Sequence, residues 1–316
     1  MKVKPKDMVS VASVTTARNA RRLLPRHIEG LLLQTRRLQE IIVVDNASTD
    51  GTAALLAEEY PEVKVLQMKE NLGAAGAWAA GLSYAALNMK HDWIWTFDDD
   101  SVPNHDALEN LMSGLESIRD EGVEIGIGVA VPVHVGTGIS YSPLLWKDAF
   151  VHPSADLLAQ PMWFADLAFA AGSLVRREVV EEIGLPRADF FMDFFDFEYC
   201  LRARSRGYKI AVVNAAQFSH EVGRAREIKL SGYKRLWPDH EPWREYYMSR
   251  NLAYAMWWLH PSPQAKWFAR RHLVRHAAGL LLFGSQKVKG LLRMAQGFVD
   301  GCRGKLGIRF VPDGSL

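Results

Sequence analysis

The sequence predicts an α/β fold in which a mostly parallel sheet is covered by helices on both faces, with a helical C-terminal extension. Runs of β-branched and apolar residues alternate with stretches of helical spacing up to residue 97. These runs are apolar on both faces, which is typical of strands buried inside a parallel sheet. From about residue 245 the alternation gives way to helical spacing rich in Trp, Leu, Arg and Lys.

The expected elements follow one another in a regular order. Strands are predicted at residues 8–16, 40–45, 63–68 and 92–97, and helices between them at 21–37, 48–60 and 76–89. The second half is predicted to contain a strand at 124–133, a loop-rich stretch at 134–162, a helix at 173–184, acidic residues among aromatics at 189–198, a basic helix and a final strand.

Composition bounds the class of protein. The chain has 316 residues, of which 48% are hydrophobic and 23% charged, so it is an ordinary globular protein rather than a disordered or fibrous one. A net charge of +2 gives no reason to expect nucleic acid as a partner. Two cysteines, no apolar leader and no apolar run of about eighteen residues favour a reducing, cytoplasmic location.

Polar residues cluster where three of the predicted strands end. They are Thr15 to Asn19, Asp45 to Ser48, and Asp98 to Asp100. In open parallel sheets, ligands bind outside the carboxyl ends of the strands, so the three clusters are expected to share one site. Three adjacent carboxylates repel one another, and they indicate either a solvated turn or a bound divalent cation. A phosphate-bearing ligand at the same edge would favour the cation, Mg²⁺ or Mn²⁺.

Two further stretches fit a nucleotide ligand. Asp45 is the first polar residue after four apolar ones and could accept hydrogen bonds from a base or ribose, or could belong to a turn and helix cap. The segment from Asn71 to Gly76 follows a strand and opens a helix, and its small residues permit close backbone approach. It does not match the glycine fingerprint of dinucleotide-binding oxidoreductases.

The acids near residue 196 are candidates for proton transfer. A carboxylate between Phe195 and Phe197 would be partly desolvated, which raises its pKa and makes it a better base near neutral pH. The alternative for each of the three acids, Asp193, Asp196 and Glu198, is a salt bridge to Arg202 or Arg204. Similarly, His220 could bind a metal or serve only as a structural hydrogen-bonding residue, and Trp163 could stack on a sugar or fill the core.

These motifs, taken in order, resemble those of family 2 glycosyltransferases of the GT-A fold. The resemblance rests on VTTARN, EIIVVDNASTDGT, ENLGAAGAWAAGL, WTFDDDSVP, FFMDFFDFEYCLRARSRGY, His220 and WREYYMSRN, and it covers residues 8–255. Within the family, the chain is most similar to bacterial rhamnosyltransferases and galactofuranosyltransferases. FFMDFFDFEYCLRA and YYMSRN favour the former, and the full DDD the latter.

The resemblance implies a role for each matching residue. Asp98 and Asp100 occupy the positions of the metal-binding DxD motif, and His220 that of a further metal ligand. Asp99 would lie near the sugar or ribose, and Asp196 would be the catalytic base. The family often has an acid immediately before the base where this chain has Phe195, which leaves Asp193 as the alternative base. The positions that hold the nucleotide and line the donor correspond to Thr15, Thr16, Arg18, Asp45, Asn71 and Gly76.

The activity implied is metal-dependent, inverting transfer of a rhamnosyl or galactofuranosyl unit from a UDP- or dTDP-linked donor. The acceptor would be a hydroxyl of a glycan or of a polyprenyl-diphosphate-linked sugar in bacterial cell-surface polysaccharide synthesis. Residues 1–245 would form the catalytic domain, with a nucleotide-sugar half at 1–120 and an acceptor and base half at 121–245. A sugar-nucleotide pyrophosphorylase and a non-catalytic sugar-nucleotide binder are the alternatives. The first normally has a glycine-rich N-terminal loop, which VTTARNARR lacks.

The C-terminal region, residues 246–316, is basic. Ten Lys and Arg side chains stand against the single acid Asp300 between residues 261 and 310. Such a region fits peripheral contact with the anionic inner face of the cell membrane, and an ordinary helical subdomain or an oligomer contact is the alternative.

Overall fold

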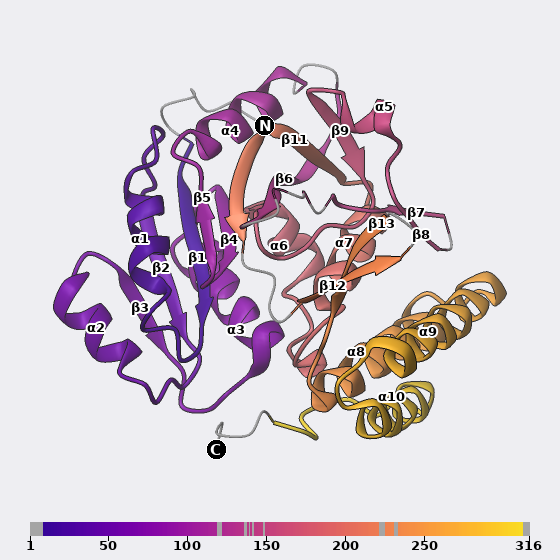
Figure 1. Ribbon diagram of the computed structural model, residues 1–316. Coiled ribbons are helices and arrows are strands. Elements are labelled where there is room, and N and C mark those ends of the chain that lie inside the picture. The colour runs from indigo at the N-terminus through magenta and orange to yellow at the C-terminus, as the bar shows by residue number, and fades with distance from the viewer. Residues whose placement is uncertain are drawn as a thin grey trace. The chain divides into compact units, whose positions relative to one another are not determined.

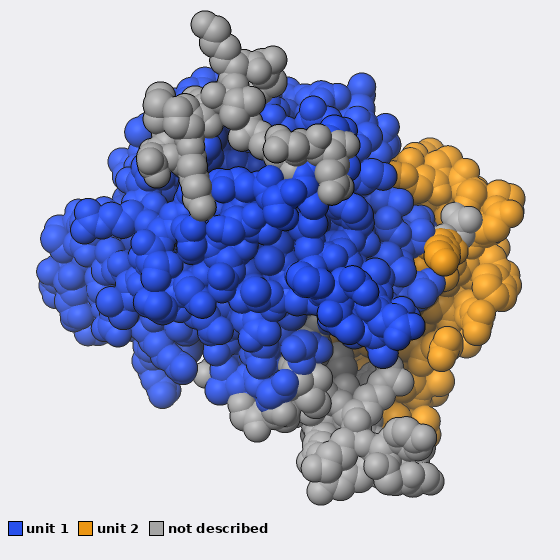
Figure 2. Space-filling model, turned by 90° about the horizontal axis from the view of Figure 1, so that it is seen from above, with its two compact units in different colours: residues 1–146, 150–187, 196–221 blue, residues 147–149, 188–195, 222–316 orange. Residues whose placement is uncertain are grey.

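The computed structural model describes residues 9–118, 122–135, 138, 140, 142–147, 149–220, 225–230 and 233–311, with the backbone alone for 225–230 and 233–238. These residues form two compact units. Unit 1 comprises residues 1–146, 150–187 and 196–221, and unit 2 comprises 147–149, 188–195 and 222–316, as Figure 2 shows by colour. The predicted division at residue 245 stays a prediction.

Unit 1 is built on a nine-stranded sheet with helices on its faces (Figure 1). The strands run in the order β3-β2-β1-β4-β10-β6-β11-β5, and β9 also pairs with β11. Strands β1 to β4 are mutually parallel, whereas β10 runs antiparallel between β4 and β6. The strands are β1 (Val11–Ala17), β2 (Glu40–Asp45), β3 (Lys64–Gln67), β4 (Trp93–Asp98), β5 (Ser101–Pro103), β6 (Ile125–His134), β9 (Met162–Ala165), β10 (Ser173–Arg176) and β11 (Lys209–His220).

Helices connect most of these strands. They are α1 (Leu24–Leu32), α2 (Thr52–Glu59), α3 (Gly73–Leu82), a π-helical turn η2 (Ser83–Asn88), α4 (Ala107–Ser117), α5 (Ala155–Leu158), α6 (Arg177–Ile183) and α7 (Phe195–Ser205). The two short strands β7 (Leu145–Trp146) and β8 (Phe150–Val151) pair with each other.

Close packing explains how α3 lies on the sheet. A Cβ atom at Gly81 would stand 2.2 Å from Cγ1 of Val14 and 3.1 Å from Cγ2 of Val44. The absence of a side chain therefore lets this helix approach β1 and β2 closely. Val14 and Val44 are fully buried, as expected for strands covered on both faces.

Unit 2 is largely helical. Its helices are η4 (Ala188–Phe190), α8 (Pro242–Tyr254), a π-helical turn η5 (Ala255–Leu259), α9 (Pro263–Phe283) and α10 (Lys287–Cys302), and its hairpin consists of β12 (Ala225–Leu230) and β13 (Tyr233–Pro238). Arg250 is fully buried in α8 and binds the carbonyl oxygens of Asp189 and Phe190.

The predicted fold class is confirmed, with one local correction. Residues 173–184 were expected to be helical throughout, but residues Ser173–Arg176 form β10 before α6 begins. Ser173, Leu174 and Val175 are buried between β4 and β6, and pairing with both strands outweighs the local helical spacing.

Candidate active site

The turn after β4 carries the three adjacent acids. Asp98 is the last residue of β4 and pairs with Thr16 of β1. The chain turns through Asp99 and Asp100 and returns as β5, which runs antiparallel to β11. In that register Ser101 lies opposite His220. The pairing of β5 with β11 therefore brings His220 beside acids that lie far from it in the sequence.

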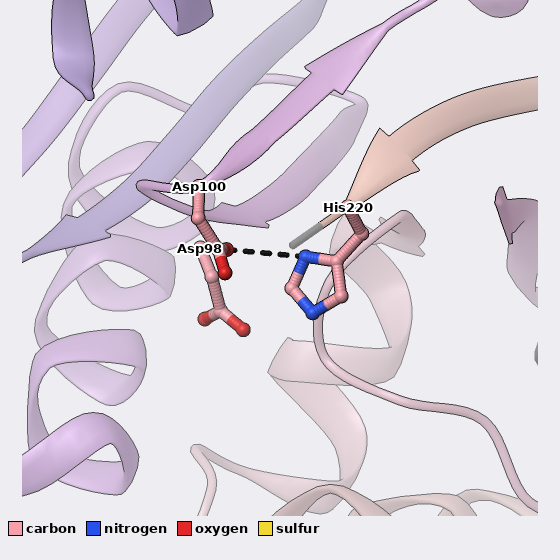
Figure 3. A group of neighbouring side chains, drawn as sticks. All are labelled: Asp98, Asp100 and His220. Carbon is pink, nitrogen blue, oxygen red and sulfur yellow. Dashed lines mark ion pairs between the residues drawn. The ribbon is translucent and has the colours of Figure 1, made fainter. Parts of the chain in front are cut away.

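Asp98, Asp100 and His220 converge on one point (Figure 3). One potential ligand atom from each lies within 4.8 Å of the others, and all three side chains are half-buried. Nδ1 of His220 is 3.1 Å from Oδ1 of Asp100 and 3.1 Å from Oγ of Ser101. The structure thus brings together the three residues predicted to bind metal.

The charges at this turn are strongly coupled. Burial, together with the negative charges of Asp98 and Asp100, raises the pKa of Asp99 to about 7. Burial alone would lower the pKa of His220, but the hydrogen bond and charge of Asp100 outweigh it, so the pKa of His220 is raised. Excess negative charge is therefore held at the edge of the sheet.

The donor atoms fit a divalent cation. Two carboxylates and an imidazole suit Mn²⁺, and Mg²⁺ is commonly held by one or two carboxylates together with substrate phosphates. A cation there would also offset the repulsion among the carboxylates of Asp98, Asp99 and Asp100. Asp98, Asp100 and His220 are accordingly the residues that could hold it.

The end of β2 carries an acid with a free oxygen. Asp45 is fully buried, and its Oδ1 accepts a hydrogen bond from the Ser48 amide at 3.0 Å. Its Oδ2 is buried and has no hydrogen-bond partner among the described residues. An orphaned buried oxygen is costly, and a hydrogen-bond donor supplied by a ligand would satisfy it.

Arg18 links the ends of β1 and β2. Its Nη1 donates to the carbonyl oxygens of Asn46 and Ala47 at 2.8 and 2.9 Å, and its amide donates to Oδ2 of Asp99 at 3.2 Å. Arg18 and Asp99 are therefore placed together, as parts of one predicted site should be. Their contact with a donor stays a prediction.

Asn46 belongs to the polar cluster predicted at the end of β2 but was given no role of its own, and it holds the loop that begins at Asn71. Its side chain donates to Oδ1 of Asn71 and the carbonyl of Gly73, and accepts from the amide of Leu72. Gly73 has φ +70°, which favours glycine there. The sequence signal for Asn46 is its place directly after the strand end. Gly76 is buried within α3.

The two threonines of β1 differ. Oγ1 of Thr16 donates to Oδ1 of Asp98 at 3.4 Å, so this hydroxyl belongs to the acidic turn. The side chain of Thr15 is fully buried, and its Oγ1 lies 2.7 Å from Nε2 of His27, while its predicted contact with the nucleotide stays a prediction. Because side chains alternate across a strand, neighbouring threonines face opposite ways, and Thr15 faces the core.

Asp196 lies in the first turn of α7 and is held by backbone amides. Its Oδ2 accepts from Ala170 at 3.3 Å, and its Oδ1 from Phe197 at 2.9 Å. The carbonyl of Ala170 accepts from Oγ1 of Thr96 at 2.5 Å, two residues before Asp98. A short chain of contacts thus ties Asp196 to β4.

The salt-bridge alternative applies to Glu198 rather than to the whole acidic run. Glu198 is buried and receives two hydrogen bonds from Arg202, at 3.0 and 2.9 Å. Arg204 pairs with Asp166 at 2.7 Å. The large Trp163 is buried and donates to Oδ1 of Asn214, so it fills the core rather than forming a surface for a sugar.

In unit 2, Asp193 lies in a loop of unusual conformation. Phe191, Asp193 and Phe194 all have positive φ, between 59° and 64°. Asn251 donates to the carbonyl oxygens of Phe190, Met192 and Asp193 at 3.0, 2.6 and 2.9 Å. These bonds offset the cost of three left-handed residues in one loop.

Comparison with known proteins gives a family match. The family model described as "Glycosyl transferase family 2" matches residues 13–184. The dTDP-rhamnosyl transferase RfbF of Shigella flexneri is 25% identical over 67% of this chain and 68% of its own length. The galactofuranosyltransferase GlfT1 of Mycolicibacterium smegmatis is 24% identical over 78% of this chain and 82% of its own. An N-acetylglucosaminyl-diphospho-decaprenol L-rhamnosyltransferase of Mycobacterium tuberculosis is 32% identical over 28% of this chain and 29% of its own.

Solved structures share the fold. GalNAc-T7, solved with UDP, GalNAc and Mn²⁺, matches with a TM-score of 0.61 and 15% identity over 95% of this chain and 57% of its own. Residues 1–349 of Staphylococcus aureus TarS, solved with UDP-GlcNAc, match with a TM-score of 0.57 and 16% identity over 93% of this chain and 81% of their own.

Proposed function

Because this chain belongs to glycosyltransferase family 2, and therefore transfers a sugar from a nucleotide-sugar donor, we propose that the sugar is rhamnose or galactofuranose. The choice of these two sugars follows the two relatives matched over most of the chain, a dTDP-rhamnosyl transferase and a galactofuranosyltransferase. The donor would be a dTDP- or UDP-linked sugar, and the acceptor a hydroxyl of a glycan or of a polyprenyl-diphosphate-linked sugar in bacterial cell-surface polysaccharide synthesis.

The observation that supports a metal-bound nucleotide-diphosphate donor is the convergence of Asp98, Asp100 and His220 at the edge where β1 and β2 also end. A nucleoside diphosphate has a charged end and a hydrogen-bonding end. The acidic turn and the orphaned Oδ2 of Asp45 offer complementary groups for both, since the first would hold a cation and the second can accept from a base or ribose.

On the donor side, Asp98, Asp100 and His220 would hold Mn²⁺ or Mg²⁺, which when bound supplies positive charge that stabilises the departing nucleoside diphosphate. Asp45 would accept a hydrogen bond from the nucleoside. Arg18 and Asn46 fix the loops on either side, because their bonds join the ends of β1 and β2 to the loop at Asn71. These bonds preorganise the donor pocket.

On the acceptor side, Asp196 would act as the base of a single inverting displacement. The acceptor oxygen bonds to the anomeric carbon as the bond from that carbon to the diphosphate oxygen breaks. The hydroxyl proton passes to a carboxylate oxygen of Asp196. Its position supports this role, because the Ala170 amide and the Thr96 hydroxyl tie it to the strand that ends at Asp98.

A panel of nucleotide sugars tests the proposal. The protein is incubated with each donor and Mn²⁺ or Mg²⁺, without acceptor, and released nucleoside diphosphate is measured. We expect slow hydrolysis of dTDP-rhamnose or UDP-galactofuranose and little of UDP-glucose or UDP-GlcNAc. Preferred hydrolysis of another sugar would contradict the donor assignment.

The same assay addresses the alternatives. Release of sugar 1-phosphate that requires added pyrophosphate would indicate a pyrophosphorylase. Donor binding without any turnover, with or without acceptor glycans, would indicate a binding protein. Either result would overturn the proposed transfer, whereas hydrolysis that speeds up on adding a lipid-diphosphate-linked glycan would support the acceptor class.

A further inference from the structure

The outer face of α9 is apolar although it meets solvent. Trp267, Val274, Leu281 and Leu282 are 58%, 69%, 52% and 68% exposed. Positions seven apart share one face of an α-helix, so residues 267, 274 and 281 form a stripe with 282 beside it. The buried residues of α9 lie on the opposite face: Ala265, Phe268, Ala269, Leu273, Gly279 and Leu280.

Helix α10 repeats this arrangement. Val288, Leu292 and Val299 are 71%, 60% and 43% exposed and share one face. Its other face carries Gly297 and Gly301, where an added Cβ would lie 2.2 Å from a carbonyl oxygen of α8. The glycine face is thus packed against α8, and the apolar stripe faces away from it. We call the seven exposed residues on the two helices the outer surface of α9 and α10.

The helices that carry the outer surface are rich in basic residues. Asp300, the one acid between residues 261 and 311, is buried and bound by Arg309 and the Tyr246 hydroxyl. The guanidinium of Arg271 lies 5.1 Å from the ring centre of Trp267, which joins a cation to the apolar stripe. The basic residues of this region are Lys266, Arg270, Arg271, Arg275, Lys287, Lys289, Arg293, Arg303, Lys305 and Arg309.

We infer that the outer surface of α9 and α10 docks on the anionic phospholipid surface of a bilayer. Apolar stripes flanked by Lys and Arg are the pattern of helices that lie in the membrane interface, where the side chains enter the acyl boundary and the cations meet phosphates. No helix in the described part of the chain is long and apolar enough to cross a bilayer, so the contact is peripheral.

Charge argues against a second copy of the chain as the occupant. Two such surfaces facing each other would bring the cations together without an exposed acid from this region to pair with them. A nucleic acid would meet the cations but would offer nothing to seven exposed aliphatic and aromatic side chains. An anionic bilayer satisfies both features at once.

Vesicle flotation tests the inference without any sugar donor, so its outcome is separate from that of the proposed transfer. The full chain is mixed with vesicles of phosphatidylglycerol and phosphatidylcholine, or of phosphatidylcholine alone. Val274→Glu/Leu282→Glu and Val288→Glu/Leu292→Glu alter the outer surface on α9 and α10. Leu33→Glu, at a side chain 68% exposed directly after α1 in unit 1, is the matched control. Circular dichroism checks the fold of each variant.

We expect the wild type and the Leu33→Glu variant to float with anionic vesicles and not with neutral ones. Each double variant should bind at least about tenfold more weakly, and raising the salt from about 0.1 M to about 0.5 M should weaken wild-type binding. Flotation of both double variants at the wild-type level would overturn the inference. So would failure of the wild type to float, or a wild-type dimer that both double variants lose.

Discussion

Arg244 binds the carboxylate of Asp193 through both of its oxygens, with Nη2 2.8 Å from Oδ1 and Nε 3.0 Å from Oδ2. This bidentate contact is among the stronger forms of ion pair. A carboxylate held in this way is committed to the arginine. This pairing supports the proposal that the base is Asp196, which accepts hydrogen bonds from the amides of Ala170 and Phe197, rather than Asp193.

The first prediction concerns Asp196→Asn. The amide keeps the shape of the side chain but cannot accept the proton, so turnover should fall by about 10²- to 10⁴-fold. Donor and Mn²⁺ affinity should change little. Steady-state transfer and calorimetric titration of the donor measure the two effects. Asp193→Asn is the matched variant and should lose far less turnover; the reverse order would assign the base to Asp193.

A second prediction concerns the cation. Asp98→Asn and Asp100→Asn each remove an anionic ligand, so the affinity for Mn²⁺ should fall by at least about tenfold. Electron paramagnetic resonance of free Mn²⁺ measures this without any turnover. Asp106→Asn, at an exposed acid a few residues further on, should leave the affinity unchanged. Unaltered Mn²⁺ binding in both variants of the acidic turn would place the metal elsewhere.

The strained loop of unit 2 gives a third prediction. Asn251→Leu removes the donors to three carbonyl oxygens while three residues keep positive φ, so the free energy of unfolding should fall by about 3 kcal/mol. Urea denaturation measures the change. The half-buried Asn110, whose side-chain amide donates to one carbonyl oxygen, supplies the control Asn110→Leu, with a loss of about 0.5 kcal/mol. Equal losses would show that the loop is not strained.

A fourth prediction follows from His27. Complete burial lowers its pKa from 6.5 to about 4, so the imidazole stays neutral between Thr15 and Ser101. As the pH falls, the imidazole of the unfolded chain becomes protonated before that of the folded chain. The stability that the neutral imidazole contributes is therefore present above pH 6.5 and is lost as the pH falls toward 4. From pH 6.5 to about 4.5 the loss should be on the order of 2 kcal/mol.

His27→Gln tests this, because glutamine does not titrate. Urea unfolding at several pH values should show a shallower dependence for this variant than for wild type. His105→Gln, at an exposed histidine, should keep the wild-type slope. A wild-type slope in His27→Gln would mean that other groups account for the acid sensitivity.

Much of the fold and part of the site could be predicted from local pattern. Strands β1, β2 and β4 are apolar on both faces, and that feature alone indicates a covered parallel sheet whose strand ends share an edge. The acids of the turn after β4 could be identified as site candidates from the sequence, because adjacent carboxylates at the end of a buried strand repel one another unless they are solvated or bind a cation. The family resemblance then added roles that spacing could not give.

Other features depend on contacts between distant residues. His220 meets Asp100 because β5 pairs antiparallel with β11, and Asp193 meets Arg244 because α8 packs beside the loop at residues 191–194. Asn46 is hydrogen-bonded to Asn71, which is 25 residues away, and Ala170 is hydrogen-bonded to Asp196, which is 26 residues away. Thr15 shows the converse: its hydroxyl suits a ligand in the sequence, but the strand turns it toward His27 in the core.

The sequence by itself determined the layered α/β architecture, the edge where the polar strand ends gather and the chemical types found there, because strand periodicity and strand ends are local properties. Only the tertiary structure decided which side chains face that edge, which acid is already paired and which helix faces are left exposed on α9 and α10. Those outcomes depend on strand register and helix packing, which join residues that have no local relation in the chain.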